Sequence, residues 1–335
     1  MASKGEESAT RPEYAAVPSK STGPKDFIST LPTREGWSTP LIEYSKYWHR
    51  PYILEEILQV QDTFTPRGDD MILVTQPKCG TTWLKALAFA IINRGIQSFS
   101  DHPLLTLHPQ RLVPFIEIPP PNAGHAYLDT LPSPRLLATH LPLSMLPHGM
   151  SSVGCRIVYL CRDPKDALVS RWHFENKILG KGFNMELEKA FAMFCEGVSE
   201  CGPFWDHCLE YWKESQARPD KVIFLKYEEI KSDPVRAVTK LARFLGAPFS
   251  EEEESSGVPQ EVVRLCSFET LTSLPVNQVG GFDRYVQGLG HVHLPSSAFF
   301  RKGVTGDWSN HLSQEMGETL DLIVQQKLEG SGLTF

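Results

Sequence analysis

The sequence lacks the features that would place the chain at a membrane or in a secretory route. The longest unbroken apolar run in its first half is Ala86–Ile92, whereas about 20 apolar residues are needed to span a bilayer. The N-terminal stretch MASKGEE has no apolar core of the kind that a secretory signal needs. No Gly follows Met1 and no Cys stands near the C-terminus, so the lipidation patterns are absent. We therefore predict a cytoplasmic protein with no membrane partner.

Excess positive charge and closely paired cysteines are missing too. The chain has 33 Lys and Arg against 40 Asp and Glu, a formal net charge of −7, which disfavours a general nucleic-acid binder. Its 7 cysteines include no C-x-x-C pair, so we expect reduced thiols and no metal. Cys195, Cys201 and Cys208 are too widely spaced for a typical zinc site. Buried helical thiols are the favoured interpretation of these three residues.

What is present is the composition of an ordinary globular protein. The chain has 335 residues, 41% of them hydrophobic and 22% charged. Residues 1–25 are rich in Ser, Lys, Glu, Pro and Thr, which predicts a disordered tail. With no linker or repeat after it, residues 26–335 are expected to form a single domain. The acidic run Glu251–Glu254 is interpreted as a solvated surface segment.

Three segments have the pattern of a buried strand followed by a turn and an amphipathic helix. The strands are predicted at residues 71–76, 156–161 and 221–226. Asp163 and Asp233 each precede a proline and can cap the helix that follows. This alternation predicts an α/β fold with a central, mostly parallel sheet flanked by helices. Because ligands of such sheets bind beyond the carboxyl ends of the strands, we expect the site at these three turns.

The first of these turns has the composition of an anion-binding loop. Its small residues let the backbone wrap an anion, and the first N–H groups of the next helix point at it. Lys78 adds a positive charge, and Thr81 and Thr82 add hydroxyl donors. The G-x-x-x-x-G-K-[ST] spelling of a P-loop is missing, because the lysine precedes Gly80 and Trp83 closes the loop. Trp83 suits a core position and the face of a purine equally well.

Four blocks of the sequence, in this order, are similar to those of one family. They are PKCGTTW at 77–83, THLP at 139–142, RDPKDALVS at 162–170 and RKGVTGDW at 301–308. Together they resemble the cytosolic sulfotransferases from about residue 36 to the end of the chain. The segments FWDH at 204–207 and LCSF at 265–268 are most similar to the plant branch. The resemblance implies a sulfotransferase fold of the P-loop-like, nucleoside-kinase-like type.

The resemblance also implies a donor, 3′-phosphoadenosine 5′-phosphosulfate (PAPS), and the residues that bind it. Such a donor needs two anion pockets and a slot for adenine, and Arg suits a planar two-bond grip on phosphate. The implied residues are Lys78, Cys79, Gly80, Thr81, Thr82 and Trp83 at the 5′-phosphosulfate, Arg162, Ser170, Arg301, Lys302 and Gly303 at the 3′-phosphate, and Tyr227, Cys266 and Phe268, with Trp83, at the adenine.

The activity that the resemblance implies is transfer of a sulfuryl group to the hydroxyl of a small molecule. His140 is the implied general base for in-line transfer, since a histidine exchanges protons near neutral pH. Lys78 is implied to neutralise charge on the leaving oxygen, and Ser170 to restrain Lys78 until the acceptor arrives. The plant-type blocks imply a secondary metabolite or hormone as acceptor. Flavonoids, brassinosteroid-like steroids, hydroxylated jasmonates and desulfoglucosinolates all stay open.

The acceptor pocket is expected to be mostly apolar with few polar anchors. The aromatic pair Tyr47-Trp48, the Pro-rich stretch 109–127 and the segment 280–300 are the predicted lining.

Several positions depart from the family's pattern. Ala138 stands where many animal relatives have Lys, Cys79 where Ser is usual, and Cys266 where many relatives have Thr. The animal dimer motif K-x-x-x-T-V-x-x-x-E is not found after Trp308, so we expect a monomer or a dimer made in another way. Two alternatives stay open, a P-loop kinase that uses ATP and a non-catalytic nucleotide-binding protein. The missing Lys-Ser/Thr ending of the loop disfavours the kinase.

Overall fold

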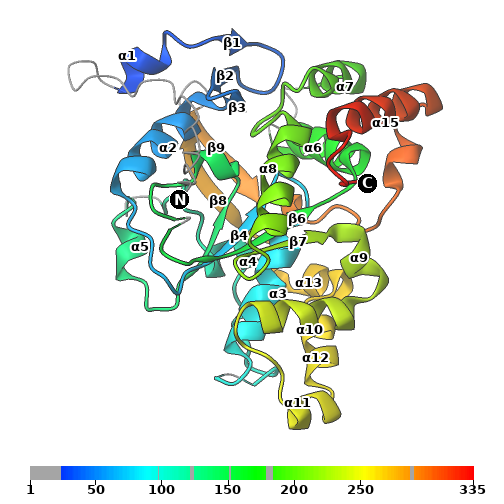
Figure 1. The fold of residues 1–335 in the computed structure, drawn as a ribbon. Coiled ribbons are helices and arrows are strands. Elements are labelled where there is room, and N and C mark those ends of the chain that lie inside the picture. Colours follow the sequence, from blue (N-terminus) through cyan, green and yellow to red (C-terminus); the bar gives the residue numbers. More distant parts are fainter. Residues whose placement is uncertain (1–23, 97, 121–123, 151, 179–183, 287–289) are drawn as a thin grey trace, which may run out of the picture.

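The structure is a computed structural model that describes residues 24–335 except 97, 121–123, 151, 179–183 and 287–289 (Figure 1). Residues 1–23 of the predicted tail lie outside the described residues. The last two residues predicted for the tail, Pro24 and Lys25, instead begin helix α1 (Pro24–Ile28).

A parallel sheet forms the centre of the molecule, as predicted. Its strand order is β5-β4-β6-β7, and every neighbouring pair is parallel. Met71 at the start of β4 lies opposite Leu136 on one side and Arg156 on the other. All of β4 is buried because helices cover both faces of the sheet. The strands are β4 (Met71–Thr75), β5 (Leu136–Thr139), β6 (Arg156–Cys161) and β7 (Val222–Lys226).

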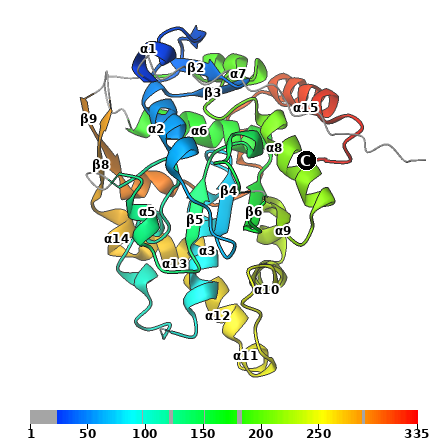
Figure 2. The same ribbon diagram turned by 60° about the vertical axis from the view of Figure 1, so that its left-hand side comes forward.

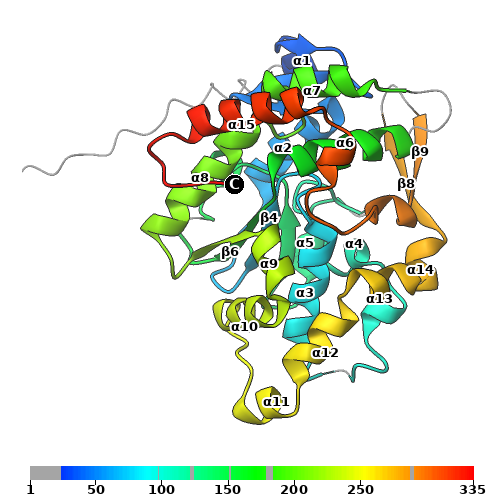
Figure 3. The ribbon, with the colours of Figure 1, turned by 90° about the vertical axis from the view of Figure 1, so that its right-hand side faces the viewer.

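Helices cover both faces of this sheet (Figure 2, Figure 3), and a hydrophobic core lies under the helices of each face. Alternation of side chains along the strands divides them, with Leu73 and Val158 in one core and Val74 and Tyr159 in the other. The helices of the first core are α3 (Thr81–Asn93), α10 (Pro234–Phe244) and α12 (Val258–Leu265). Those of the second are α2 (Pro51–Thr63), α6 (Pro164–Ile178), α7 (Leu187–Cys195), α8 (Phe204–Ala217) and α15 (Gln314–Leu328).

Short elements complete the described part of the chain. The helices are α4 (Pro109–Leu112), α5 (Tyr127–Thr130), α9 (Tyr227–Ser232), α11 (Glu251–Ser255), α13 (Phe268–Ser273) and α14 (Pro275–Gln278). The strands are β1 (Thr33–Arg34), β2 (Leu41–Tyr44), β3 (Tyr47–His49) and a hairpin of β8 (Gly281–Val286) and β9 (Gly290–Pro295).

Both predicted aspartate caps are confirmed. The Asp163 carboxylate accepts hydrogen bonds from the backbone N–H groups of Lys165 at 2.8 Å and Asp166 at 3.2 Å, at the start of α6. Asp233 accepts from the N–H of Arg236 at 3.1 Å, at the start of α10. In each case the proline at the first helical position fixes the backbone for the turn that follows.

The acidic run Glu251–Glu254 is largely solvated, as predicted, but it is also the helix α11. Ser250 and Glu253 form a capping box that starts this helix. Glu253 also binds Arg94 at 2.8 Å, so the run is tied to the end of α3.

The three cysteines interpreted as buried helical thiols differ from one another. Cys208 is buried in α8, Cys195 is half-buried at the end of α7, and Cys201 lies in a turn rather than a helix. The helical interpretation is therefore wrong for Cys201. Within the described residues, no group of three or more His, Cys, Asp or Glu could hold a metal ion. A search of the described part of the chain found no helix long and apolar enough to cross a membrane.

Candidate active site

The carboxyl ends of the four parallel strands open into one large cavity. Its volume is about 1330 Å³, and the loops after all four strands contribute to its wall. This is the edge of the sheet at which the sequence predicted a site. The predicted site residues that line it are Lys78, Gly80, Thr81, Thr82, Trp83, His140, Arg162, Ser170, Tyr227, Phe268, Arg301, Lys302 and Gly303.

Two predicted binding residues, Cys79 and Cys266, are not among the residues that line the cavity. Both are fully buried, at 0% exposure, and they pack in the two cores on opposite faces of the sheet. Burial raises the pKa of each thiol above its ordinary value, which makes both thiols unreactive. Cys79 can therefore offer a ligand only its backbone, and Cys266 packs behind the cavity wall.

The loop between β4 and α3 is shaped by two residues with a left-handed backbone. Gly80 has φ +106, and a Cβ at this position would lie 2.9 Å from the ring of Tyr227, so only glycine fits. Lys78 has φ 73, an uncommon conformation for a side chain that is often found at functional sites. Among the described residues, no side chain caps the start of α3. Its first N–H groups are therefore available to an anion.

The Lys78 ammonium is desolvated inside the cavity. Its Nζ lies 3.9 Å from the centre of the Phe174 ring. Desolvation, followed by the charges of Arg171 and Arg162, lowers the pKa of Lys78 to about 7. An anion that enters beside Lys78 would favour the charged form of this lysine.

His140, the first residue after β5, is held in one tautomer. Its Nδ1 lies 2.7 Å from the carbonyl oxygen of Thr75. Because a carbonyl oxygen only accepts, Nδ1 carries the proton and Nε2 is left as a free base. Desolvation lowers the pKa of His140 to about 4, so the ring is neutral. Its backbone N–H donates to the buried Glu117 carboxylate at 2.7 Å, which fixes the residue in the cavity wall.

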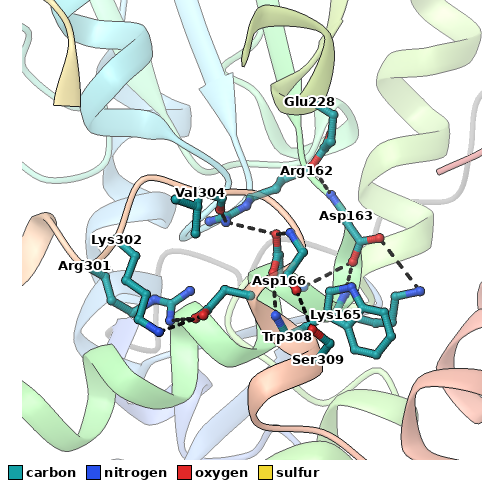
Figure 4. A network of polar contacts seen from close by, with 12 residues as sticks. Arg162, Asp163, Lys165, Asp166, Glu228, Arg301, Lys302, Val304, Trp308 and Ser309 are labelled. Atoms are coloured by element: carbon teal, nitrogen blue, oxygen red, sulfur yellow. Dashed lines mark hydrogen bonds and ion pairs between the residues drawn. The ribbon is translucent and has the colours of Figure 1, made fainter. Parts of the chain in front are cut away.

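Asp166 joins the start of α6 to the C-terminal segment of the chain (Figure 4). This fully buried carboxylate accepts from the N–H of Gly306 at 2.8 Å, the N–H of Trp308 at 3.0 Å and Arg162 Nη2 at 3.1 Å. Arg162 Nη2 also donates to the carbonyl oxygen of Val304 at 2.7 Å. Two predicted phosphate-binding blocks, far apart in the sequence, are thereby brought together.

Arg301 and Lys302 share one carboxylate, that of Asp307. Lys302 Nζ lies 2.7 Å from one oxygen of Asp307, and Arg301 Nη1 binds the other. Burial opposes ionisation of Asp307, but the hydrogen bonds from Lys302 and Arg301 lower its pKa below the ordinary value. The positive charges of Arg162 and Arg301 both contribute to the lowered pKa of Lys78. The three cations therefore interact electrostatically within one cavity.

Three aromatic rings line the cavity beside these cations. The ring centres of Trp83 and Tyr227 are 5.1 Å apart, and the Arg162 guanidinium lies 4.6 Å from the Tyr227 ring. Phe268 packs against Gly303, where a Cβ would lie 2.4 Å from the Phe268 ring. Gly303 is thus required for the close approach of this ring to the C-terminal block.

Of the three segments predicted to line an acceptor pocket, two contribute to the wall of this cavity and the third does not. The segments 109–127 and 280–300 contribute Phe115, Ile118, Tyr127, Phe282, Leu294 and Phe299. Tyr47 and Trp48 pack in the second core instead, and the Tyr47 hydroxyl donates to Glu210 at 2.7 Å. Helix α2 supplies the missing wall through Tyr52, Ile53, Glu56 and Gln59.

Lys85 lies behind the cavity wall, where it contacts two lining residues, and no sequence pattern predicted this position. It lies in α3, fully buried, with Nζ 3.3 Å from the centre of the Phe115 ring and 2.6 Å from Gln110 Oε1. Gln110 in turn donates to the Thr82 hydroxyl at 3.2 Å. No pattern in the sequence marks Lys85, because it stands beside the apolar stripe of α3 and its partners are distant in the chain.

A buried cluster of four charges was missed as well. Arg50 and Arg171 bind Glu175 and Glu200, with Arg50 Nη2 2.5 Å from Glu175 and Arg171 Nη2 2.7 Å from Glu200. All but Glu175 line the cavity. The negative charge of Glu200 raises the pKa of His140, but the larger effect of desolvation keeps that pKa low. Arg171 and Glu175 are four residues apart in α6, but Arg50 and Glu200 are distant from them in the sequence, so no local spacing marked the whole cluster.

The fold and the cavity together define a class of protein, an α/β protein with a large cavity lined by Lys and Arg at the carboxyl edge of an open parallel sheet. A family model described as "Sulfotransferase domain" matches residues 68–332. Cytosolic sulfotransferase 1 of Arabidopsis thaliana is 41% identical over 325 residues, which cover 93% of this chain and 94% of that protein. Cytosolic sulfotransferase 12 of the same plant is 41% identical over 333 residues, 98% of each chain. The chain belongs to the sulfotransferase family, as a cytosolic enzyme of the plant type.

Solved structures support the same assignment. An Arabidopsis thaliana protein described as a putative steroid sulphotransferase is 39% identical, with a TM-score of 0.71, over 92% of this chain and 94% of that one. The mouse sulfotransferase SULT7A1, solved in complex with PAP, is 26% identical with a TM-score of 0.66, over 87% of this chain and 96% of that one. The predicted sulfotransferase fold, enzyme class and cytoplasmic location are thus confirmed, and the kinase alternative is wrong.

Proposed function

We propose that this sulfotransferase takes a sulfuryl group from PAPS and transfers it in line to a hydroxyl of a small plant metabolite or hormone. The observation that carries this proposal is the joining of the blocks around Arg162 and Arg301 beside the α3 loop and His140 in one cavity. The bound PAP of the mouse relative supports a donor of this chemistry. The Arabidopsis relative described as a putative steroid sulphotransferase makes a hydroxysteroid a suitable first acceptor.

The residues present fit such a donor at both ends. The uncapped start of α3 and Lys78 suit the 5′-phosphosulfate, with Cys79 contributing its backbone alone. Arg162 Nε is buried and has no hydrogen-bond partner within the described residues, so it can donate to a 3′-phosphate. Ser170, Arg301, Lys302 and Gly303 line the same cavity, and we expect them to complete that pocket. We expect Trp83, Tyr227 and Phe268, which line it too, to frame the adenine.

In the proposed mechanism the acceptor hydroxyl lies between His140 and the sulfur atom. His140 Nε2 takes the hydroxyl proton while the oxygen forms its bond to sulfur and the bond from sulfur to the bridging phosphate oxygen breaks. Protonated Lys78 neutralises the charge that grows on that bridging oxygen. The carbonyl oxygen of Thr75 keeps the imidazole oriented throughout. The negative charges of the donor raise the pKa of His140 from its low value in the free cavity.

Transfer of a labelled sulfuryl group tests this proposal. Purified protein is incubated with ³⁵S-labelled PAPS and a panel of hydroxylated phenols and steroids, and labelled esters are separated from the donor. We expect at least one labelled ester, and tighter binding of adenosine 3′,5′-bisphosphate than of ATP with Mg²⁺. Tighter binding of ATP, or bound donor with no transfer to any acceptor, would contradict it.

A further inference from the structure

One part of the cavity wall is polar and is formed by α2 and the residue His125, neither of which belongs to the proposed donor-binding set. Tyr52, Glu56 and Gln59 lie on α2 at positions i, i+4 and i+7, and all three line the cavity. Leu54 and Ile57 point from the other side of α2 into the core. Residues with this spacing share one face of a helix. The face of α2 toward the acceptor region therefore carries a carboxylate and an amide.

His125, just before α5, meets this face of α2. Its side chain is only 5% exposed, and Nε2 lies 3.5 Å from Glu56 Oε2. Neither ring nitrogen has a hydrogen-bond partner among the residues that the structure describes. Buried polar atoms are nearly always paired in folded proteins. An unpaired imidazole that lines a cavity therefore indicates a partner that enters from the cavity.

The ring of His125 can both donate and accept. Burial lowers the pKa of His125 below its ordinary value, so the ring is neutral near pH 7. A neutral imidazole has one N–H donor and one bare nitrogen. The Glu56 carboxylate beside it only accepts when ionised. A group that satisfies both residues must donate to Glu56 and exchange a second hydrogen bond with His125.

We propose that Glu56 and His125 form a second polar subsite, which binds a second hydroxyl group of the acceptor. A hydroxyl fits both residues, since it donates one hydrogen bond and accepts others. A carboxylate or sulfate at this place would be repelled by Glu56, and an apolar end would leave His125 unpaired. Phe115, Ile118 and Tyr127 supply an apolar wall in the same cavity. The substrate class is therefore an apolar molecule with at least two hydroxyl groups, and this inference rests on the proposed function.

A matched pair of steroids tests the subsite. Estradiol has a hydroxyl at each end, and its analogue without the hydroxyl on the five-membered ring has only the phenol. In the wild-type enzyme, the ratio of kcat/KM for estradiol to kcat/KM for the analogue should be at least about ten, because a hydrogen bond to a charged group has about this effect. Glu56→Gln and His125→Phe should each bring the ratio close to one. Glu55→Gln is the matched control, since Glu55 lies on α2 outside the cavity wall.

The possible failures separate the two proposals. Three results would overturn the subsite alone. The ratio could be near one in the wild type, it could stay unchanged in Glu56→Gln and His125→Phe, or Glu55→Gln could change it as much as they do. The subsite also falls if adenosine 3′,5′-bisphosphate binds normally but neither steroid is sulfated, while other phenols are. Absence of both nucleotide binding and transfer to any acceptor would overturn the proposed function instead.

Discussion

A single hydrogen bond decides what His140 can do. Nδ1 donates to the carbonyl oxygen of Thr75, so the lone pair of the ring is on Nε2, the nitrogen free to take a proton from an acceptor. The sequence predicted His140 from its Thr-His-Leu-Pro context. It could not predict the tautomer, because the partner is a backbone atom 65 residues earlier in the chain.

Replacing His140 by Ala should reduce kcat by about 100- to 10,000-fold, the usual contribution of a general base. Binding of adenosine 3′,5′-bisphosphate should be nearly unchanged, because the imidazole contacts the acceptor rather than the nucleotide. Calorimetric titration and initial rates measure the two effects separately. His148→Ala, at an exposed histidine outside the cavity, should leave both unchanged. Loss of nucleotide binding together with activity would make His140 a structural residue.

Lys78 should make donor binding dependent on pH. Its pKa is lowered to about 7, so above that pH the free enzyme carries a neutral lysine. An anionic ligand favours the protonated form, so binding takes up a proton and affinity falls as pH rises from 7 to 9. The affinity should fall by up to about tenfold per pH unit, which corresponds to about one proton taken up for each ligand bound. Isothermal titration at several pH values measures it.

Lys78→Arg is the control for this pH dependence. Arginine stays charged throughout this range, so its donor affinity should vary little between pH 7 and 9. An equal slope in the variant would assign the titration to another group.

At the scale of elements, Asp166 connects the first turn of α6 to the segment 301–308. In the sequence, Asp166 is only a negative charge in the first turn of the helix that Asp163 caps. Its buried carboxylate instead accepts from two backbone N–H groups of the C-terminal segment. Such a contact between segments about 140 residues apart leaves no local pattern, so only the fold reveals it.

Asp166→Ala should lower the free energy of unfolding by about 3 kcal/mol or more, because it leaves buried donors and Arg162 unpaired. Thermal unfolding should show a drop of several degrees. Asp321→Ala removes an exposed partner of Lys165 and should cost less than about 1 kcal/mol. Similar losses in both variants would mean that Asp166 does not connect these elements.

The two phosphate-binding blocks should act on one phosphate group. Arg162→Ala or Arg301→Ala should weaken the binding of adenosine 3′,5′-bisphosphate by about 10- to 100-fold, because each variant loses a hydrogen bond to a charged group. Binding of adenosine 5′-phosphate, which lacks the 3′-phosphate, should change little. Equilibrium binding of the two nucleotides to each variant measures the difference. Equal losses of affinity for both nucleotides would mean that these arginines do not bind the 3′-phosphate.

At the scale of the whole molecule, the parallel sheet and the edge that carries the site were predictable. Apolar strands at 71–76, 156–161 and 221–226, each followed by a turn and an amphipathic helix, left few other arrangements. The predicted set lacked β5, whose short sequence Leu136–Thr139 has no strong alternation. The acceptor wall was harder to predict, since α2 reaches the cavity through tertiary packing rather than through a motif.

A crystal structure with adenosine 3′,5′-bisphosphate would show directly whether one cavity holds both ends of the donor. We expect the 5′-phosphate at the start of α3, within hydrogen-bonding distance of Lys78, and the 3′-phosphate between Arg162 and the pair Arg301 and Lys302. The adenine should lie against Trp83. A nucleotide bound elsewhere, or a 3′-phosphate in solvent with Arg162 and Arg301 turned away from it, would contradict the account.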